Sequence, residues 1–235
     1  YYVALEINGG NDSLNNGSIN SPFRTVNKAL TLMNSGDTCF IRSGNYHQEV
    51  LIDGKNDIVI TSFNDEFVCF EGTSKITSNW VSYDSNVFKT TLNRHIWQLF
   101  VDNNQMVMAR WPNAQFSDKS IYSWNTWAEG DESSSINGLT VIDNTKSFFS
   151  GLDFSLDTAH AILNIGSFRT WNRKIQYSEG SEVIEYNNVP NNQYKDKHHY
   201  FFVEGDLNLL DTINEWYHNP STGELWLMTD GTNPN

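Results

Sequence analysis

The sequence predicts an all-β protein that begins with solenoid coils and continues into antiparallel hairpins. Three observations carry this prediction. Short apolar runs rich in β-branched and aromatic residues recur between Gly, Asn and Asp turns. One early segment has helical spacing of apolar residues, and two later segments read as hairpins. The domain boundary is expected near residue 76, giving coils over 1–76 and a β-rich subdomain over 77–235.

The first 36 residues predict a strand, a loop and a helix. Tyr1 to Ile7 reads as a strand, and 8–20 is an Asn/Gly/Ser-rich loop. Its Asp and Asn oxygens could hold Ca²⁺, but the loop lacks EF-hand length and a closing Glu, so a solvated loop is favoured. Residues 22–33 predict an amphipathic helix with Ser21 as N-cap, Pro22 at the first helical position and Gly36 as the stop.

The next forty residues predict strands that repeat at a spacing of about twenty residues. One repeat runs from Phe40 to Ile60, and a second runs from Leu51 to Cys69. Such coils bury their apolar faces by stacking, and the 22–33 helix is placed to cap the stack. Cys39 and Cys69 lie in apolar runs, where a free buried thiol is favoured over a disulfide. The predicted strands are 38–42, 50–52, 58–61 and 68–70.

From Thr73 the sequence predicts a hairpin-rich insertion. A hairpin is expected over 96–111, with its turn at 102–105, and the HNPSTG turn predicts a second with a left-handed Gly223. The polar stretch 115–142 carries no predicted strand. Further predicted strands are 87–91, 161–165, 174–177, 183–186, 199–203, 215–217 and 224–228, with a helical turn over 206–210.

Composition limits the function classes. Lys plus Arg number 15 against 28 Asp plus Glu, a formal charge of −13, which argues against nucleic acid. No apolar run reaches the ~20 residues of a membrane helix. The chain opens on a strand-like segment rather than a signal, so we expect a secreted protein whose signal peptide is removed. No Cys/His spacing fits a zinc site.

Three blocks of sequence resemble the N-terminal part of secreted right-handed parallel β-helix proteins of the polysaccharide lyase and glycoside hydrolase type. They are NDSLNNGSINSPFRTVNKALTLMNSGDTCFIRSGNYHQEVLI, WQLFVDNNQMVMARWPNA and EWYHNPSTGELWLMTDG. The resemblance implies a right-handed parallel β-helix with an inserted antiparallel β subdomain. It also implies that further coils, which usually carry the catalytic residues, follow in a longer chain.

The same resemblance implies a polysaccharide or oligosaccharide partner. We expect a polysaccharide-degrading enzyme, hydrolase or lyase, acting on an acidic or algal-type glycan. A noncatalytic carbohydrate-binding or adhesive module and a structural cap domain are the alternatives.

Aromatic and amide side chains are the candidate substrate-binding residues. Trp124 and Trp127 lie in polar surroundings and could stack on sugar rings, whereas Trp97, Trp111, Trp216 and Trp226 are favoured as core. Arg110 could clamp a uronate or sulfate, with a structural role slightly favoured. The full candidate set is Arg110, Trp111, Asn113, Trp124, Trp127 and Trp171.

Candidate catalytic residues come from one basic cluster and one acidic cluster. A lyase needs a cation and a base, which Arg169, His199 and Tyr200 could supply, although solvated surface charge is favoured. A hydrolase needs two carboxyl groups, and Glu204 and Asp206, with Asp211 and Glu215, are the densest supply near aromatics.

Overall fold

The computed structural model describes residues 1–132, 138–141, 149, 151–156, 158–166, 169–177, 183–187 and 200–235. These residues are mostly β, with one α-helix, which confirms the all-β class. The chain divides into two compact units, Tyr1–Ile76 (the N-terminal unit) and Thr77–Asn235 (the C-terminal unit). Among the described residues, no helix is both long and apolar enough to cross a lipid bilayer.

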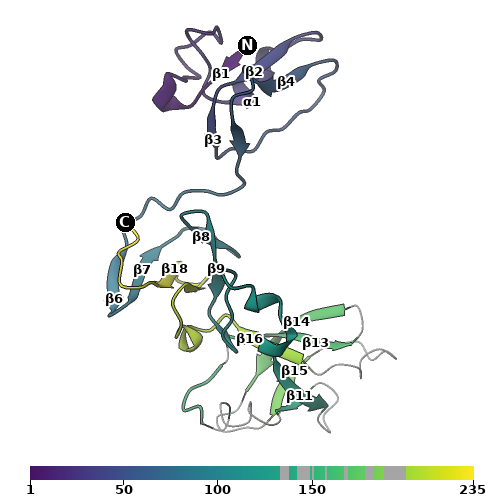
Figure 1. The fold of residues 1–235 in the computed structure, drawn as a ribbon, viewed down its shortest axis with the longest axis vertical. Helices are drawn as coiled ribbons and strands as arrows, with labels where there is room; N and C mark the ends of the chain where they lie inside the picture. Colours follow the sequence, from purple (N-terminus) through teal and green to yellow (C-terminus); the bar gives the residue numbers. More distant parts are fainter. Residues whose placement is uncertain are drawn as a thin grey trace. The chain divides into compact units, whose positions relative to one another are not determined.

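The N-terminal unit consists of two parallel sheets and one helix (Figure 1). The helix packs against β1 and β2, and its residues Val26, Ala29 and Leu30 enter the core of the unit. One sheet contains β1 (Tyr2–Val3), β2 (Thr38–Ile41) and β4 (Val59–Ser62); the other contains β3 (Gly44–Tyr46) and β5 (Val68–Phe70).

The helix begins later than the sequence predicts. Helix α1 spans Val26–Leu32, and its N-cap is Thr25, whose side chain accepts a hydrogen bond from the Lys28 amide. The Asp12 carboxylate, from the loop before the helix, accepts hydrogen bonds from the Thr25 amide and hydroxyl. Ser21 and Pro22 therefore lie before the helix, because a Thr cap held by a distant carboxylate fixes the start. At the other end the C-cap is Met33, before Gly36.

The predicted spacing of about twenty residues is confirmed for the first repeat, since Phe40 pairs with Thr61, one residue beyond the expected Ile60. The second repeat starts elsewhere than predicted, because Cys69 pairs with Asn45 of β3 and not with Leu51. The 50–52 run forms no strand, and Leu51 is 70% exposed. Sequence reasoning missed β3, because its Gly-Asn-Tyr lacks β-branched residues. The strand predicted over 1–7 stops at Val3, and Glu6–Asn8 forms the 3₁₀ turn η1. Both cysteines are free.

The C-terminal unit contains a six-stranded sheet in the order β6-β7-β18-β17-β9-β8. The predicted hairpins are confirmed: Asp102 and Asn103 both have positive φ in the first turn, and Gly223 has φ +73° in the second. The strands are β6 (Val81–Asp84), β7 (Val87–Thr91), β8 (Leu99–Val101), β9 (Asn104–Met108), β17 (Glu215–His218) and β18 (Glu224–Met228).

This sheet is not wholly antiparallel, contrary to the expected antiparallel subdomain. Strands β9 and β17 pair in parallel, with Val107 opposite Glu215 and Met108 opposite Trp216. The chain leaves the sheet after β9 and returns at β17, and such a crossover is what parallel neighbours require.

The crossover contains a closed β-barrel. Six strands pair in a ring, β13-β14-β15-β12-β11-β16, and β16 also pairs with β13; every pairing is antiparallel. The short strand β10 (Arg110–Trp111) pairs with the end of β16. The ring strands are β11 (Ala128–Glu132), β12 (Gly138–Val141), β13 (His160–Gly166), β14 (Arg169–Gln176), β15 (Val183–Tyr186) and β16 (Tyr200–Glu204).

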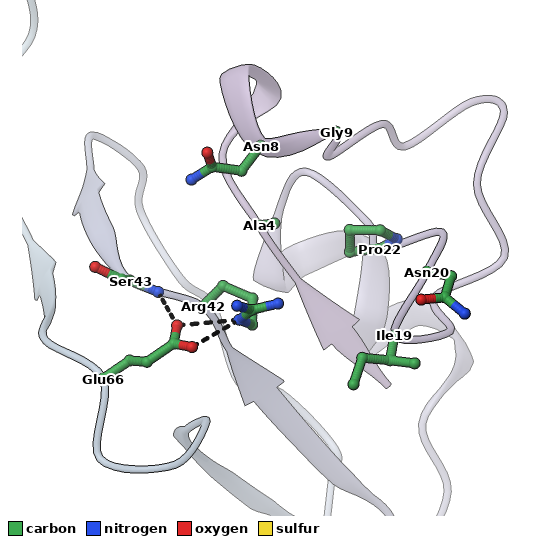
Figure 2. Close-up of a pocket in the computed structure, with 9 residues that line it drawn as sticks. All are labelled: Ala4, Asn8, Gly9, Ile19, Asn20, Pro22, Arg42, Ser43 and Glu66. Atoms are coloured by element: carbon green, nitrogen blue, oxygen red, sulfur yellow. Dashed lines mark hydrogen bonds and ion pairs between the residues drawn. The ribbon is translucent and has the colours of Figure 1, made fainter.

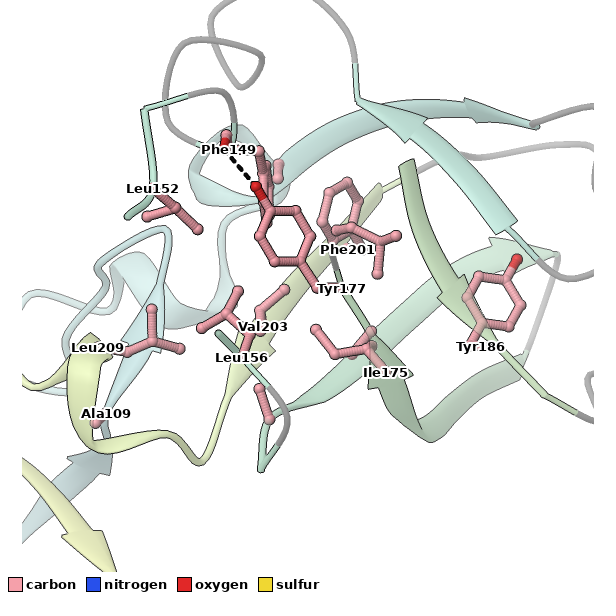
Figure 3. Packing of buried hydrophobic residues seen from close by; sticks show 14 of the residues in the cluster. Ala109, Phe149, Leu152, Leu156, Ile175, Tyr177, Tyr186, Phe201, Val203 and Leu209 are labelled. Carbon is pink, nitrogen blue, oxygen red and sulfur yellow. Dashed lines mark hydrogen bonds between the residues drawn. The ribbon is translucent and has the colours of Figure 1, made fainter. Parts of the chain in front are cut away.

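The barrel interior is filled by alternate residues of these strands, as expected for a small barrel. Ile175, Phe201 and Val203 are almost fully buried there, and the Tyr177 hydroxyl donates a hydrogen bond to the Phe149 carbonyl (Figure 3). Ala109 and Leu209 belong to the same cluster, as do Tyr217 and Trp226 of the six-stranded sheet. The barrel and the sheet therefore share one core.

Candidate functional site

Strand β16 divides its side chains between the core and an outer face. Phe201 and Val203 are fully buried in the barrel interior, whereas Tyr200, Phe202 and Glu204 are partly exposed. This alternation is the period of two that any strand imposes. The outer side chains of β16 are therefore available for a surface role.

Neighbouring strands add polar groups to this outer face. Residues directly opposite one another in an antiparallel ladder project from the same face. Tyr200 lies opposite Glu129 and Asn164, Phe202 opposite Ile162, and Glu204 opposite Arg110 and His160. One end of the face is thus aromatic and amide-bearing, and the other is charged.

Two short 3₁₀ turns place tryptophans against the aromatic end. They are η2 (Ser120–Tyr122) and η3 (Trp124–Thr126), and the Thr126 hydroxyl donates to the carbonyls of Ser120 and Ser123. Because these bonds tie η3 to the preceding turn, the orientation of the segment is fixed by its own backbone.

The resulting aromatic patch comprises Tyr122, Trp124, Trp127, Tyr200 and Phe202. Trp124 lies against Tyr200 with ring centroids 5.6 Å apart, and Trp127 meets Phe202 edge-on at 4.9 Å. The side chains of Tyr122 and Trp124 are 75% and 63% exposed. The patch therefore presents solvent-facing rings backed by a second layer of rings.

Arg110 occupies the charged end but is buried, with 1% exposure. Its guanidinium carbon lies 3.5 Å from the centroid of the Phe202 ring, and its Nε donates to the Pro112 carbonyl. Neither terminal nitrogen has a hydrogen-bond partner among the described residues. Burial lowers the Arg110 pKa to about 10, against the opposing influence of Glu204 and Glu215. This placement makes Arg110 a structural cation.

Glu215 is the buried carboxyl group beside Arg110, with 0% exposure. Its two oxygens accept hydrogen bonds from the backbone amides of Arg110, Asp211 and Thr212. Burial and then the nearby Asp211 raise the pKa of Glu215 to about 8, while the three amide donors oppose that rise. Glu215 thus connects the start of β10, at Arg110, with the loop at Asp211 and Thr212 that precedes β17.

Glu204 and Asp206, the two acidic candidates on this side, have different surroundings. Burial raises the pKa of Glu204, and the nearby Arg110 opposes that rise. Asp206 caps the turn η5 (Leu207–Leu209), accepting from the Asn208 amide and from the Thr158 hydroxyl at 2.6 Å. The helical turn predicted here is confirmed, and it gives Asp206 a structural contact.

The remaining sequence candidates lie away from the patch or outside the described residues. Asn113 donates to Asp211 and Thr212, and half-buried Trp111 packs edge-on against Phe149. Trp171 is 8% exposed in the barrel interior. Arg169 begins β14, and His199 lies outside the described residues.

Tryptophan burial follows the sequence prediction only in part. Trp216 and Trp226 are buried, as predicted, but Trp97 is 75% exposed. Strand β8 begins at Leu99, so Trp97 precedes the strand and has no cross-strand neighbour to cover it. Phe202 and Tyr122 were missed as site residues, although the alternation within YFFVE could have placed Phe202 on the face of Tyr200.

No group of three or more His, Cys, Asp or Glu side chains is positioned to hold a metal ion within the described ranges. In the 8–20 loop, the Asp12 carboxylate accepts hydrogen bonds from the Arg24 and Thr25 amides. The Asn11 side-chain oxygen accepts from the amides of Ser13 and Leu14. These oxygens organise the loop itself.

Comparisons with known proteins describe the fold. A family described as "Protein of unknown function (DUF1565)" matches residues 8–52. No curated protein matches the chain. A solved structure named "Glycoside hydrolase" aligns with a TM-score of 0.72 and 18% identity over 99% of this chain and 44% of that one. The chain therefore shares a fold with part of that protein and spans less than half its length.

A second solved structure is titled "The complex structure of XylC with xylose". It aligns with a TM-score of 0.38 and 17% identity, covering 100% of this chain and 30% of that one.

Proposed function

We propose that the chain is the N-terminal portion of a secreted polysaccharide-degrading enzyme of the glycoside hydrolase type, and that its aromatic patch binds the glycan. The observation that carries the proposal is the pair of exposed rings: Trp124 packs against Tyr200, and Tyr122 packs against Phe116. The fold shared with a protein named glycoside hydrolase supports the hydrolase class over the lyase class.

Physical chemistry favours a sugar over an apolar ligand at this patch. Flat aromatic faces pack against the C–H faces of pyranose rings, and Trp keeps a polar N–H for a hydroxyl. The amide of Asn164 and the carboxylate of Glu129 share the face with Tyr200. Because the supporting rings are already packed, little side-chain freedom is lost on binding.

The described residues support binding more than cleavage. Glu215, whose carboxyl has the pKa suited to an acid, is fully buried, and Asp206 is engaged as a cap. In the proposal, the cleavage chemistry of the whole enzyme is supplied by coils beyond this segment.

The N-terminal unit supplies the start of those coils in the same proposal. Parallel pairing of β1, β2 and β4, and separately of β3 and β5, is the pattern expected of right-handed β-helix coils. Strands β4 and β5 each have one partner in the described chain, and Val59 and Phe70 on them are half-exposed. A following coil would pair with these edges and cover these side chains.

Titration with neutral, uronate-containing and sulfated polysaccharides, followed by calorimetry, tests the patch. We expect one class to bind and Trp124→Ala to weaken binding about tenfold, the loss of about 1.4 kcal/mol of ring contact. Trp97→Ala is the matched control, since Trp97 is a tryptophan outside the patch that is 75% exposed, against 63% for Trp124. Binding by none of the glycans, or equal binding by the Trp124 variant, would overturn the proposal.

A further inference from the structure

The N-terminal unit contains a surface hollow that the aromatic patch does not explain. Its volume is about 370 Å³, within the range of small-molecule pockets. Four segments surround it: the η1 turn with the residues beside it, the 19–22 loop, the chain that follows β2, and the loop that carries Glu66 (Figure 2). The whole hollow lies within the N-terminal unit.

Arg42 is the central group of the hollow, and its neighbours fix its orientation. Its Nε donates to both carboxylate oxygens of Glu66 at 3.0 Å, and its guanidinium lies 5.1 Å from the centroid of the Phe63 ring. The Ser43 amide holds the Glu66 carboxylate at 2.6 Å. Both terminal nitrogens of Arg42 therefore remain as oriented donors without a hydrogen-bond partner among the described residues.

The rim supplies further unpaired polar groups and an apolar wall. The side-chain amides of Asn8 and Asn20 make no hydrogen bond within the described part of the chain, and each can both donate and accept. Ile19 and Pro22 line the same hollow and offer an apolar surface. In Figure 2 the Arg42 guanidinium lies between Glu66 and the 19–22 segment.

We infer that this hollow is a second carbohydrate site, which binds one or two neutral sugar rings through vicinal hydroxyls. The parallel terminal N–H groups of Arg42 match two adjacent hydroxyl oxygens, and the two amides can serve further hydroxyls. Ile19, which is exposed, would contact the ring carbons, whereas Pro22 is buried behind it in the wall of the hollow. A uronate is disfavoured, because Glu66 already neutralises Arg42 and the chain carries a net charge of −13.

Side-chain NMR on the isotopically labelled chain tests the inference. Glucose, galactose, mannose and xylose, with their disaccharides, are titrated against the Arg42 Nε–H and the Asn8 and Asn20 amide signals; glucuronate and galacturonate are the charged probes. We expect at least one neutral sugar to shift these signals saturably, with a Kd of about 1–20 mM.

Asn20→Ala should weaken this binding about fivefold without loss of folding, because its side chain makes no hydrogen bond in the described structure. Asn56→Ala is the matched control, an exposed Asn of the same unit outside the hollow. Trp124→Ala should leave the shifts unchanged, which separates this site from the aromatic patch. The inference is overturned if no neutral sugar shifts these signals, if only the uronates do, or if Asn20→Ala and Asn56→Ala behave alike.

Discussion

Arg42 in the N-terminal unit and Arg110 in the C-terminal unit place the same side chain in opposite surroundings. Arg42 is partly exposed, its Nε is paired with Glu66, and that hydrogen bond raises its pKa. Arg110 is 1% exposed, lies on the Phe202 ring and has its pKa lowered by burial. The first arginine is oriented toward a hollow, and the second is enclosed where the barrel joins the sheet.

The position of each arginine in the fold, rather than its residue type, decides its role. An exposed ion pair contributes little to stability but can hold a donor in place for a ligand. A buried cation contributes to stability through the ring and the carboxyl group packed against it, and its removal leaves that carboxyl group without a counter-charge. Four further predictions test this contrast between the two arginines.

Removal of Arg110 should have the largest effect. Arg110→Ala is expected to destabilise the C-terminal unit by about 3–5 kcal/mol, because Glu204 would lose its counter-charge and the Phe202 ring would lose the guanidinium packed on it. All eight tryptophans lie in Thr77–Asn235, so denaturation followed by tryptophan fluorescence reports this unit. Arg94→Ala, at an exposed arginine of the same unit, should change stability by less than about 0.5 kcal/mol. Equal effects of the two variants would refute the assignment.

A backbone clash should disturb the N-terminal unit more than the loss of its ion pair. A Cβ on Gly10 would lie 1.9 Å from the Ala4 carbonyl oxygen, so Gly10→Ala is expected to destabilise the unit by about 2–3 kcal/mol. Faster amide exchange at Ala29 and Ile41 would report this loss. Gly72→Ala separates the clash from the loss of a glycine, since its Cβ would meet no atom within 4 Å and its φ, like that of Gly10, lies outside the left-handed region.

The carboxyl group of Glu215 should make the C-terminal unit less stable as pH rises. Its pKa is raised to about 8 in the folded chain, above the ordinary value of about 4.3 in the unfolded one. The folded state therefore holds the proton more tightly. The resulting stability is present below about pH 4 and is lost between about pH 4 and 8, by up to about 1.4 kcal/mol per pH unit.

Glu215→Gln should flatten this dependence, because an amide cannot ionise. Urea denaturation at several pH values, followed by tryptophan fluorescence, measures the slope. Glu224→Gln, in the adjacent strand β18 at a partly exposed carboxylate paired with Lys89, should retain the wild-type slope. A wild-type slope in Glu215→Gln would assign the pH dependence to another group.

The smallest effect on stability should come from Arg42. Arg42→Ala is expected to cost the N-terminal unit at most about 1 kcal/mol, because the Arg42–Glu66 pair is partly exposed. Amide exchange at Ala29 and Ile41, compared with an Arg24→Ala variant at another exposed pair, gives the measurement. A loss as large as that of Arg110→Ala would erase the contrast between the two arginines.

Local chemistry in the sequence predicts the turns and several strands. The Asp102–Asn103 turn and Gly223 follow from residues that tolerate positive φ, and β5, β7 and β15 have the predicted bounds. The start of α1 was misplaced, because the cap at Thr25 depends on Asp12, a residue thirteen positions earlier. The spacing of apolar residues within the helix carries no information about this contact, which Asp12 makes from the preceding loop.

Long-range pairing is what the sequence did not predict. The barrel closes where β13 pairs with β16, two strands that are far apart in the chain. The segment 115–142 contains two strands of the ring, β11 and β12, although its polar composition does not predict a strand. Polar surroundings did indicate the exposure of Trp124. The rings behind it, Tyr200 and Phe202, come from the distant strand β16, so the patch as a group exists only once the barrel is closed.

The parallel pairing of β9 with β17 has a consequence for how this architecture can change in evolution. The two strands run side by side in one direction, so the segment that links them must return along the full length of the strands. If a deletion reduced the barrel to a tight turn, the remaining link would be too short to return to the start of β17. Descendants can therefore remodel the barrel or exchange it for another module of sufficient reach, but shortening to a hairpin would cost them the pairing of β9 with β17.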